Sequence, residues 1–480
     1  MSIEDVPVRP KLGLRDYETY AELRPAVDRL KEAASRAALG KRRVVMLNST
    51  ARGGGVAEMM PGLLGLFMDL GVDVRWLIIS PTEIEFFDLT KRLHNLIHGS
   101  DGIDISKGDL DVYERTSQNL AANLTDHLRK EDLVVVHDPQ PAGCGALAQR
   151  NLGFTAVWRC HIGLDGENEA TRKAWSFLLP WLSDYAVNVF SVPSYVPKDL
   201  VSRSTIIPPG IDPLGHKNRA LSVHKLTGIL YSAGLIDSSQ PMLYPRFPHL
   251  AQRLQPDGTF GSPTEPEDIG LLFRPIVTQV SRWDKLKGWD TLISAFVKLK
   301  RRHADDPRIR LTRLVLAGPD PASIQDDPEG QKVFEELART WSELDADIQK
   351  DIAVLSLPME DQKQNALMVN AIQRCSSVVV QASRREGFGL TVSEALWKAI
   401  PVLGTGAAGI RAQLEDGVHG RIVPDPEDAE SMSLALMDLL SRPDQRASWG
   451  LNGRMRTGQE FLVLSQAQRW LSLLGRLNGA

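Results

Sequence analysis

Short apolar runs alternate with amphipathic stretches along most of this chain, and the alternation predicts strands and helices in turn. In the first half it predicts strands at residues 43–48, 72–79, 133–137, 156–160, 186–191 and 205–208, a helix at 56–70, and helical stretches between most of the other strands. Alternating strands and helices are typical of a parallel sheet with helices on both faces. Residues 41–213 are therefore predicted to form a doubly wound α/β domain.

The same pattern restarts in the second half. It predicts strands at residues 275–281, 312–317, 352–357, 377–382 and 401–404, again with helices between them. Residues 274–455 are therefore predicted to form a second doubly wound domain. The last helix, near residues 467–477, is expected to cross back to the first domain, so residues 456–480 are treated as a separate C-terminal segment.

Two segments interrupt this pattern. Residues 1–40 are interpreted as an N-terminal extension that contains a helix around residues 17–38. Residues 214–273 include a stretch, 254–266, in which proline and glycine cluster. Such composition favours irregular structure, so residues 214–273 are predicted to be an inter-domain linker with an inserted arm.

Length and charge narrow the functional classes. The 480 residues have room for two to three domains of about 150 residues each. The net charge of −4 argues against non-specific nucleic-acid binding. No apolar run approaches the roughly 20 residues that span a bilayer, and residues 1–7 lack the pattern of a signal peptide. A cytoplasmic protein without nucleic-acid or membrane partners is expected.

The cysteines and acidic clusters give no reason to expect a metal. Cys144, Cys160 and Cys375 are widely spaced and form no C-x-x-C motif, so neither a disulfide framework nor a zinc site is predicted. The paired aspartates within residues 101–111 resemble metal-binding pairs, but no apolar strand precedes them. They are interpreted as loop residues.

Two glutamates, Glu386 and Glu394, stand eight positions apart after the predicted strand at 377–382. Glu386 precedes a glycine-flanked turn, and Glu394 opens a helical pattern. Ligands bind at strand C-termini in open α/β sheets, and helix N-termini attract anions. This favours a phosphorylated, polyhydroxylated ligand. The competing interpretation is a capping box between Thr391 and Glu394, which needs no ligand.

A second cluster follows the strand at 275–281. Arg282 and Lys287 precede a predicted helix, and two cations there suit a diphosphate, with arginine as a fork and lysine as a point charge. A solvated basic turn is the alternative for such a pair taken alone. The occurrence of this cationic pair together with the Glu386 loop favours the interpretation as a diphosphate site.

Polar motifs also close strands of the first half. Residues 53–55 are three glycines that can let a backbone approach a ligand closely. Residues 137–141 and 158–165 point polar groups toward the presumed cleft between the domains. A lone histidine is more often structural than catalytic, but His161 at a strand end is a functional candidate.

Taken together, these motifs resemble a known family. The chain is similar to retaining glycosyltransferases of the GT-B fold, in which two Rossmann-like domains face a cleft, and most of all to trehalose synthases of the glycosyltransferring type. Retaining trehalose phosphorylases look similar as well. The motifs that carry the resemblance are residues 48–58, 137–141, 158–161, 208–213, 279–282 and 385–395.

The resemblance implies roles for individual residues. Glu386 would hold donor-sugar hydroxyls, Arg282 and Lys287 would neutralise the leaving phosphates, and His161 would lie near the donor sugar's 6-hydroxyl; these four form the predicted catalytic set. The predicted donor-binding residues are Glu394, which would hold the ribose, and Gly387, Phe388, Gly389, Leu390 and Thr391. The predicted acceptor-binding residues are Gly54, Gly55, Asp138, Gln140 and Arg159.

The implied activity is the reversible transfer of glucose from UDP-, ADP- or GDP-glucose to glucose, which forms trehalose with retention. No cofactor is required, and Mg²⁺ could accompany the diphosphate without a protein ligand. Partners are small-molecule sugars and nucleotide sugars, and a homodimer is the simplest oligomer to expect. A retaining trehalose phosphorylase and a non-catalytic sugar-nucleotide sensor remain alternatives.

Overall fold

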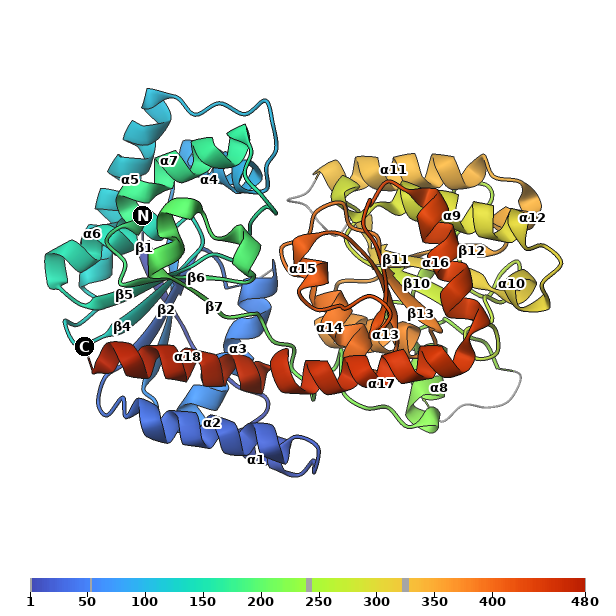
Figure 1. Cartoon of the computed structure of the whole chain (residues 1–480), viewed down its shortest axis with the longest axis horizontal. Helices are drawn as coiled ribbons and strands as arrows, with labels where there is room; N and C mark the ends of the chain where they lie inside the picture. The colour runs from blue at the N-terminus through green and yellow to red at the C-terminus, as the bar shows by residue number, and fades with distance from the viewer. Residues whose placement is uncertain (1, 52–53, 239–243, 322–327, 480) are drawn as a thin grey trace. The chain divides into compact units, whose positions relative to one another are not determined.

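The computed structural model describes residues 2–51, 54–238, 244–321 and 328–479. The chain divides into two compact units, residues 1–212 with 458–480, and residues 213–457. Each unit carries one sheet with helices on both faces (Figure 1). Two α/β units of this kind agree with the predicted fold class.

The first unit is built on a seven-stranded sheet in the order β1-β3-β2-β4-β5-β6-β7. All neighbouring strands are parallel except β1 and β3. The order reverses between β2 and β4, so ligand-binding residues are expected where these two strands end. The strands are β1 Ser2–Val6, β2 Val44–Asn48, β3 Val74–Ser80, β4 Leu133–His137, β5 Thr155–Arg159, β6 Val187–Phe190 and β7 Ser204–Ile206.

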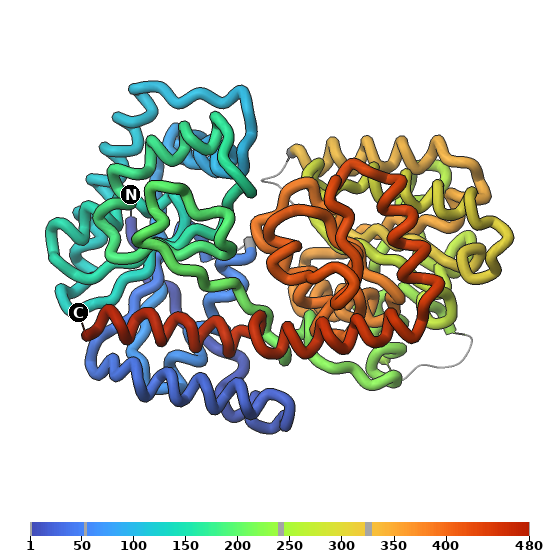
Figure 2. Tube along the Cα trace, in the orientation of Figure 1, coloured from blue at the N-terminus to red at the C-terminus, as the bar shows by residue number. Residues whose placement is uncertain are grey.

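The last helix of the chain belongs to this first unit. Figure 2 shows α18 running beside α2, and a Cβ on Gly475 would lie 2.6 Å from the Cα of Ala37. Only glycine therefore allows this approach. The helices of the unit are α1 Leu14–Glu18, α2 Arg24–Ala37, α3 Gly54–Asp69, α4 Ile84–Ile97, α5 Lys107–Thr125, α6 Ala142–Leu152, α7 Glu169–Leu182 and α18 Val463–Asn478, with short 3-10 turns η1 Pro193–Tyr195 and η2 Lys198–Arg203.

The second unit contains an eight-stranded sheet in the order β15-β14-β13-β10-β11-β12-β8-β9. Here the strand order reverses between β10 and β13, and only the β8 and β9 pairings are antiparallel. The strands are β8 Gln252–Leu254, β9 Phe260–Gly261, β10 Ile276–Val280, β11 Arg313–Pro319, β12 Ile352–Leu357, β13 Val378–Gln381, β14 Val402–Thr405 and β15 Gly420–Val423.

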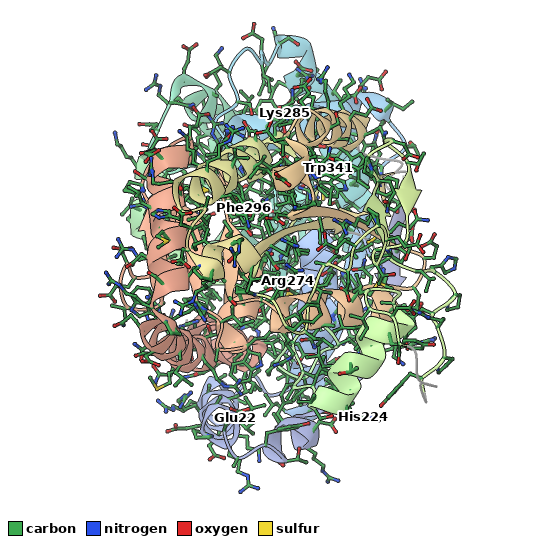
Figure 3. The ribbon with its side chains drawn as sticks, turned by 90° about the vertical axis from the view of Figure 1, so that its right-hand side faces the viewer. Glu22, His224, Arg274, Lys285, Phe296 and Trp341 are labelled. Atoms are coloured by element: carbon green, nitrogen blue, oxygen red, sulfur yellow. The ribbon has the colours of Figure 1, made fainter. Side chains whose placement is uncertain are left out.

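Helices cover both faces of this second sheet. Phe296 of α9 and Trp341 of α11, both labelled in Figure 3, are buried in one apolar cluster with the sheet. The helices are α8 Val223–Ser232, α9 Trp289–Arg302, α10 Pro307–Leu311, α11 Pro328–Ser342, α12 Ala346–Gln349, α13 Gln362–Arg374, α14 Leu390–Trp397, α15 Ala408–Arg411, α16 Ala429–Ser441 and α17 Pro443–Glu460, with the turn η3 Lys285–Lys287. None of the described helices is both long and apolar enough to cross a bilayer.

Two segment assignments differ from the sequence analysis. Residues 1–40 are not an extension, because β1 pairs with β3 as an edge strand and the expected single helix is the pair α1 and α2. Residues 214–273 are not a linker, because they fold with the second unit, where α8 packs on α13 and β8 pairs with β12.

A buried charge cluster lies where β11 and β12 begin. Asp351 accepts from the Arg313 guanidinium and pairs with Lys300, and all three side chains are at most 6% exposed. Lys300 also donates to three backbone carbonyls near the end of α10. Removing the Asp351 charge would leave Lys300 without this buried counter-charge, and would leave Arg313 with only Glu267, whose side chain is 46% exposed.

Substituting Asp351→Asn is therefore expected to lower the free energy of unfolding of the second unit by about 3 kcal/mol, the cost typical of breaking a buried pair. Differential scanning calorimetry would measure the loss. The control is Asp305→Asn, which removes an exposed carboxylate. Equal melting of the two variants would contradict the prediction.

Candidate functional site

The predicted second-half residues meet at the switch point between β10 and β13. Lys287 follows β10, Glu386 follows β13, and the Lys287 Nζ lies 2.7 Å from the Glu386 Oε2. Parallel neighbours end at the same edge of a sheet, so two loops far apart in sequence share this place. The structure thus brings together two of the four predicted catalytic residues.

The Glu386 carboxylate is held from three directions. Its Oε2 accepts hydrogen bonds from Lys287, from Gln381 Nε2 at 3.0 Å and from Ser383 Oγ at 3.0 Å. Burial by itself would raise the pKa of Glu386. The attraction and hydrogen bond of Lys287, helped by Ser383 and Gln381, outweigh burial and hold the pKa below its usual value. Glu386 is therefore an anion at neutral pH.

The Lys287 loop is fixed by close backbone approach. Asp284 caps the turn η3 by accepting from the Leu286 N–H. Gly288 has φ of 64°, and a Cβ there would lie 2.1 Å from the Ala382 carbonyl oxygen, so glycine is required. Gln279 of β10 joins the two loops, because it donates to the Lys287 carbonyl and accepts from the Ala382 N–H.

The helix that carries Glu394 does not begin with the capping box. Its N-cap is Gly389, with φ of 82° and no side-chain cap. Thr391 is already inside α14, and Glu394 is buried one turn further, with its Oε1 3.8 Å from the Lys217 Nζ. The capping interpretation is wrong, and Glu394 instead belongs to a charged cluster of the second unit.

The turn between the two glutamates is held by Gln413. Its Nε2 donates to the carbonyls of Phe388 and Gly389. A Cβ on Gly409 would lie 2.6 Å from the Cα of Phe388, so α15 packs directly against the turn. The backbone of this turn, which includes predicted donor-binding positions, is therefore fixed before any ligand arrives.

Arg282 differs from Lys287 in its exposure. Its side chain is 63% exposed, with the guanidinium 3.8 Å from the Asp284 carboxylate. Sequence reasoning expected Arg282 and Lys287 to act alike on phosphate. The structure distinguishes a largely buried lysine, paired with Glu386, from an exposed arginine near Asp284.

In the first unit, two predicted motifs meet at the ends of β4 and β5. His137 Nδ1 lies 3.0 Å from His161 Nε2, and the His161 N–H donates to Asp138 Oδ1 at 2.8 Å. Burial, aided by Arg159, lowers the pKa of His137 to about 3 and also lowers that of His161, with His137 contributing. Both rings are therefore neutral.

Asp138 and Arg159 lie beside the histidine pair. Asp138 adopts φ of 67° and holds the turn that positions His161, and burial raises its pKa to about 6 although the His161 N–H and Arg159 oppose this. Arg159 is completely buried and donates to Ser191 Oγ. Its burial argues against the predicted direct contact with an acceptor sugar.

The remaining acceptor candidates lie at loop ends. Gly54 and Gly55 open α3, and a Cβ on Gly55 would meet no described atom within 4 Å, so its backbone can be approached closely. Gly53 lies outside the described residues. Gln140 is half-buried, and its Oε1 has no hydrogen-bond partner among the described residues. In the described part of the chain, no group of three or more His, Cys, Asp or Glu could hold a metal ion.

Two family models match the chain, "Trehalose synthase, N-terminal domain" over residues 46–197 and "Glycosyl transferases group 1" over residues 267–456. A trehalose synthase from Pyrococcus horikoshii is 32% identical, over 97% of this chain and 98% of its own. The chain belongs to the trehalose synthase family. The family member from Rubrobacter xylanophilus is 33% identical over 97% of each chain.

More distant relatives share its fold or part of its length. A trehalose phosphorylase from Pleurotus pulmonarius is 26% identical over 90% of this chain and 57% of its own. The solved trehalose-phosphate synthase of Burkholderia vietnamiensis has a TM-score of 0.65 at 18% identity, over 91% of this chain and 97% of that one. The fold is GT-B, and the protein is a trehalose-related glycosyltransferase.

The Lys287–Glu386 pair predicts a pH-dependent stability. The lowered pKa of Glu386 stabilises the fold above the usual glutamate pKa, and this contribution is lost as the pH falls through the lowered value. In Lys287→Met, burial would instead raise the pKa of Glu386. The variant should lose about 3–5 kcal/mol at neutral pH, and the loss should shrink as the pH falls through the carboxyl range.

Thermal unfolding from pH 7 downward would measure this difference. Lys285→Met is the matched control, because Lys285 (Figure 3) is 60% exposed and pairs only loosely with Glu336. A loss that is the same at every pH, or no greater than in the control, would show that the ion pair does not set the charge of Glu386.

Proposed function

We propose that the protein is a retaining glucosyltransferase that transfers glucose from a nucleoside-diphosphate glucose to free glucose and forms trehalose reversibly. The observation that carries the proposal is the anchored Lys287–Glu386 pair at the switch point of the second unit. It offers one cation and one carboxylate at the place where α/β sheets bind nucleotides.

The second unit supplies groups for each part of such a donor. The Glu386 carboxylate can accept hydrogen bonds from sugar hydroxyls, and Lys287 and the exposed Arg282 can approach a diphosphate. Glu394, buried in α14, would receive the ribose hydroxyls. A nucleoside diphosphate explains why a second carboxylate stands one helical turn beyond the turn at 386–389.

The configuration of the anomeric carbon is retained if the leaving group departs and the acceptor attacks on the same face of the sugar. The bond from the anomeric carbon to the phosphate oxygen breaks through an oxocarbenium-like state. The acceptor hydroxyl oxygen then bonds to that carbon on the same face, and its proton passes to the leaving phosphate oxygen. No protein nucleophile is needed, so the enzyme contributes positioning and charge stabilisation. The cations would stabilise the departing diphosphate.

A trehalose phosphorylase is the second candidate, favoured by the similarity to the Pleurotus protein over 90% of this chain. It would use inorganic phosphate and glucose 1-phosphate, which carry no ribose. Glu394 then has no substrate partner, although the ion contact with Lys217 would still account for its burial.

Incubating the pure protein with trehalose and UDP, ADP, GDP or inorganic phosphate in separate reactions tests both candidates. We expect nucleotide-sugar formation with at least one diphosphate, detected by chromatography. Glucose 1-phosphate formed with phosphate alone would identify a phosphorylase. Absence of product in every reaction would refute the trehalose-forming reaction.

Glu394→Gln tests the nucleotide site directly. Loss of a charged hydrogen bond to ribose should raise KM for the nucleotide sugar by about tenfold, with little change in KM for glucose. Steady-state kinetics would measure both constants, with the exposed Glu415→Gln as control. An unchanged donor KM would place the ribose elsewhere.

A further inference from the structure

His137 and His161 form a hydrogen bond between two neutral imidazoles. Their planes differ by 13°, and their centres are 5.3 Å apart. With 3.0 Å between the facing nitrogens, this separation is about the sum of the hydrogen-bond length and the two ring radii. The rings therefore lie edge to edge in nearly one plane, so one ring donates N–H and the other accepts.

Met46 decides which ring donates. The other nitrogen of His137, Nε2, lies 3.4 Å from the Met46 Sδ in the buried sheet. Sulfur is a weak acceptor and cannot donate, so the contact is favourable only when Nε2 carries the proton. His137 Nδ1 then has only a lone pair, and the proton between the rings sits on His161 Nε2.

This protonation state also determines what the other ring nitrogen of His161, Nδ1, can bind. A neutral ring with its proton on Nε2 has a lone pair on Nδ1. The His161 side chain is half-buried, and its Nδ1 makes no hydrogen bond to the described residues. The Asp138 carboxylate holds the backbone N–H of His161, which fixes the base of the side chain.

We infer that His137 is a positioning residue that fixes the tautomer of His161, so that His161 Nδ1 accepts a hydrogen bond from a hydroxyl of a bound sugar. The ordered series runs from the sugar O–H to His161 Nδ1, from His161 Nε2–H to His137 Nδ1, and from His137 Nε2–H to Met46 Sδ. The contact between His161 Nδ1 and a sugar hydroxyl rests on the proposed function. The tautomers of the two histidines do not depend on it.

Charged groups around the pair favour this neutral state. The Arg159 guanidinium is completely buried close by and disfavours a proton on either ring. Asp138 is the acidic neighbour, and its carboxylate is already engaged by the His161 backbone. A histidinium at either position would meet Arg159 without an unengaged anion.

Histidine nitrogen NMR on the ligand-free protein tests the tautomers. Long-range proton–nitrogen correlations of ¹⁵N-histidine protein, with His137→Asn and His161→Gln for assignment, report which nitrogen is protonated. We expect both rings to be neutral and protonated on Nε2 at pH 6. Protonation on Nδ1 in both rings, or a charged ring, would overturn the inference.

Two substitutions separate positioning from packing. His137→Asn keeps an acceptor oxygen near the place of Nδ1 but loses ring volume, whereas His137→Phe keeps the ring and loses the acceptor. If His137 positions His161, kcat/KM should fall at least about tenfold in the phenylalanine variant, the effect of one lost hydrogen bond, and much less in the asparagine variant.

The reverse order of activities would show that His137 only fills space, and would overturn the inference. Thermal midpoints of both variants would show that each is folded at the assay temperature. If the wild type forms no trehalose with any donor, the proposed function fails, but the NMR result still decides the tautomers. The two failures are therefore distinguishable.

Discussion

A carboxylate placed at the buried edge of a parallel sheet remains an anion only where a cation and hydrogen-bond donors meet it. Glu386 satisfies this condition through Lys287, Gln381 and Ser383. Much of the local structure around Glu386 holds these donors in place. Gly288 allows the loop that carries Lys287 to pass close to the Ala382 carbonyl. Gln279 joins this loop to the one that carries Glu386 by a hydrogen bond to each.

The first unit places neutral polar groups, rather than an ion pair, at the ends of its strands. At the ends of its strands it holds two neutral imidazoles joined by a hydrogen bond, with Arg159 nearby. A neutral, oriented acceptor suits a sugar hydroxyl, whereas an ion pair, with an exposed arginine in the same loop as its lysine, suits a diphosphate. The two sheets share an architecture, yet one carries a neutral hydrogen-bonded pair at its strand ends and the other an ion pair.

The sequence predicted the parts of this structure that depend on long apolar runs. The strands β4 and β12 match their predicted bounds because each is a continuous buried run. By contrast, β1 contains the charged pair Glu4 and Asp5 and gains its place from pairing with β3. Strands β8 and β9 have three and two residues, which is too short for periodicity to show.

The candidate site was predictable to a similar extent. Residues that follow strand ends were found, because strand order alone brings Glu386 to Lys287 and His161 to His137. The roles of Gln279, Gln381 and Ser383 were missed, since no local pattern marks a side chain that bonds across two loops. The capping box failed because Gly389, in a left-handed conformation, begins α14 ahead of Thr391.

The segment first interpreted as a linker has a physical reason to belong to the second unit. The Asn370 side chain donates to the carbonyls of His216 and Arg219, and Lys398 donates both to Asn218 and to the Glu394 carbonyl. Residues 216–219 are thus fixed to α13 and α14. Lys217 faces Glu394 because its neighbours are held in place. A change in this segment would therefore reach the acid proposed to hold the ribose without altering any residue of α14.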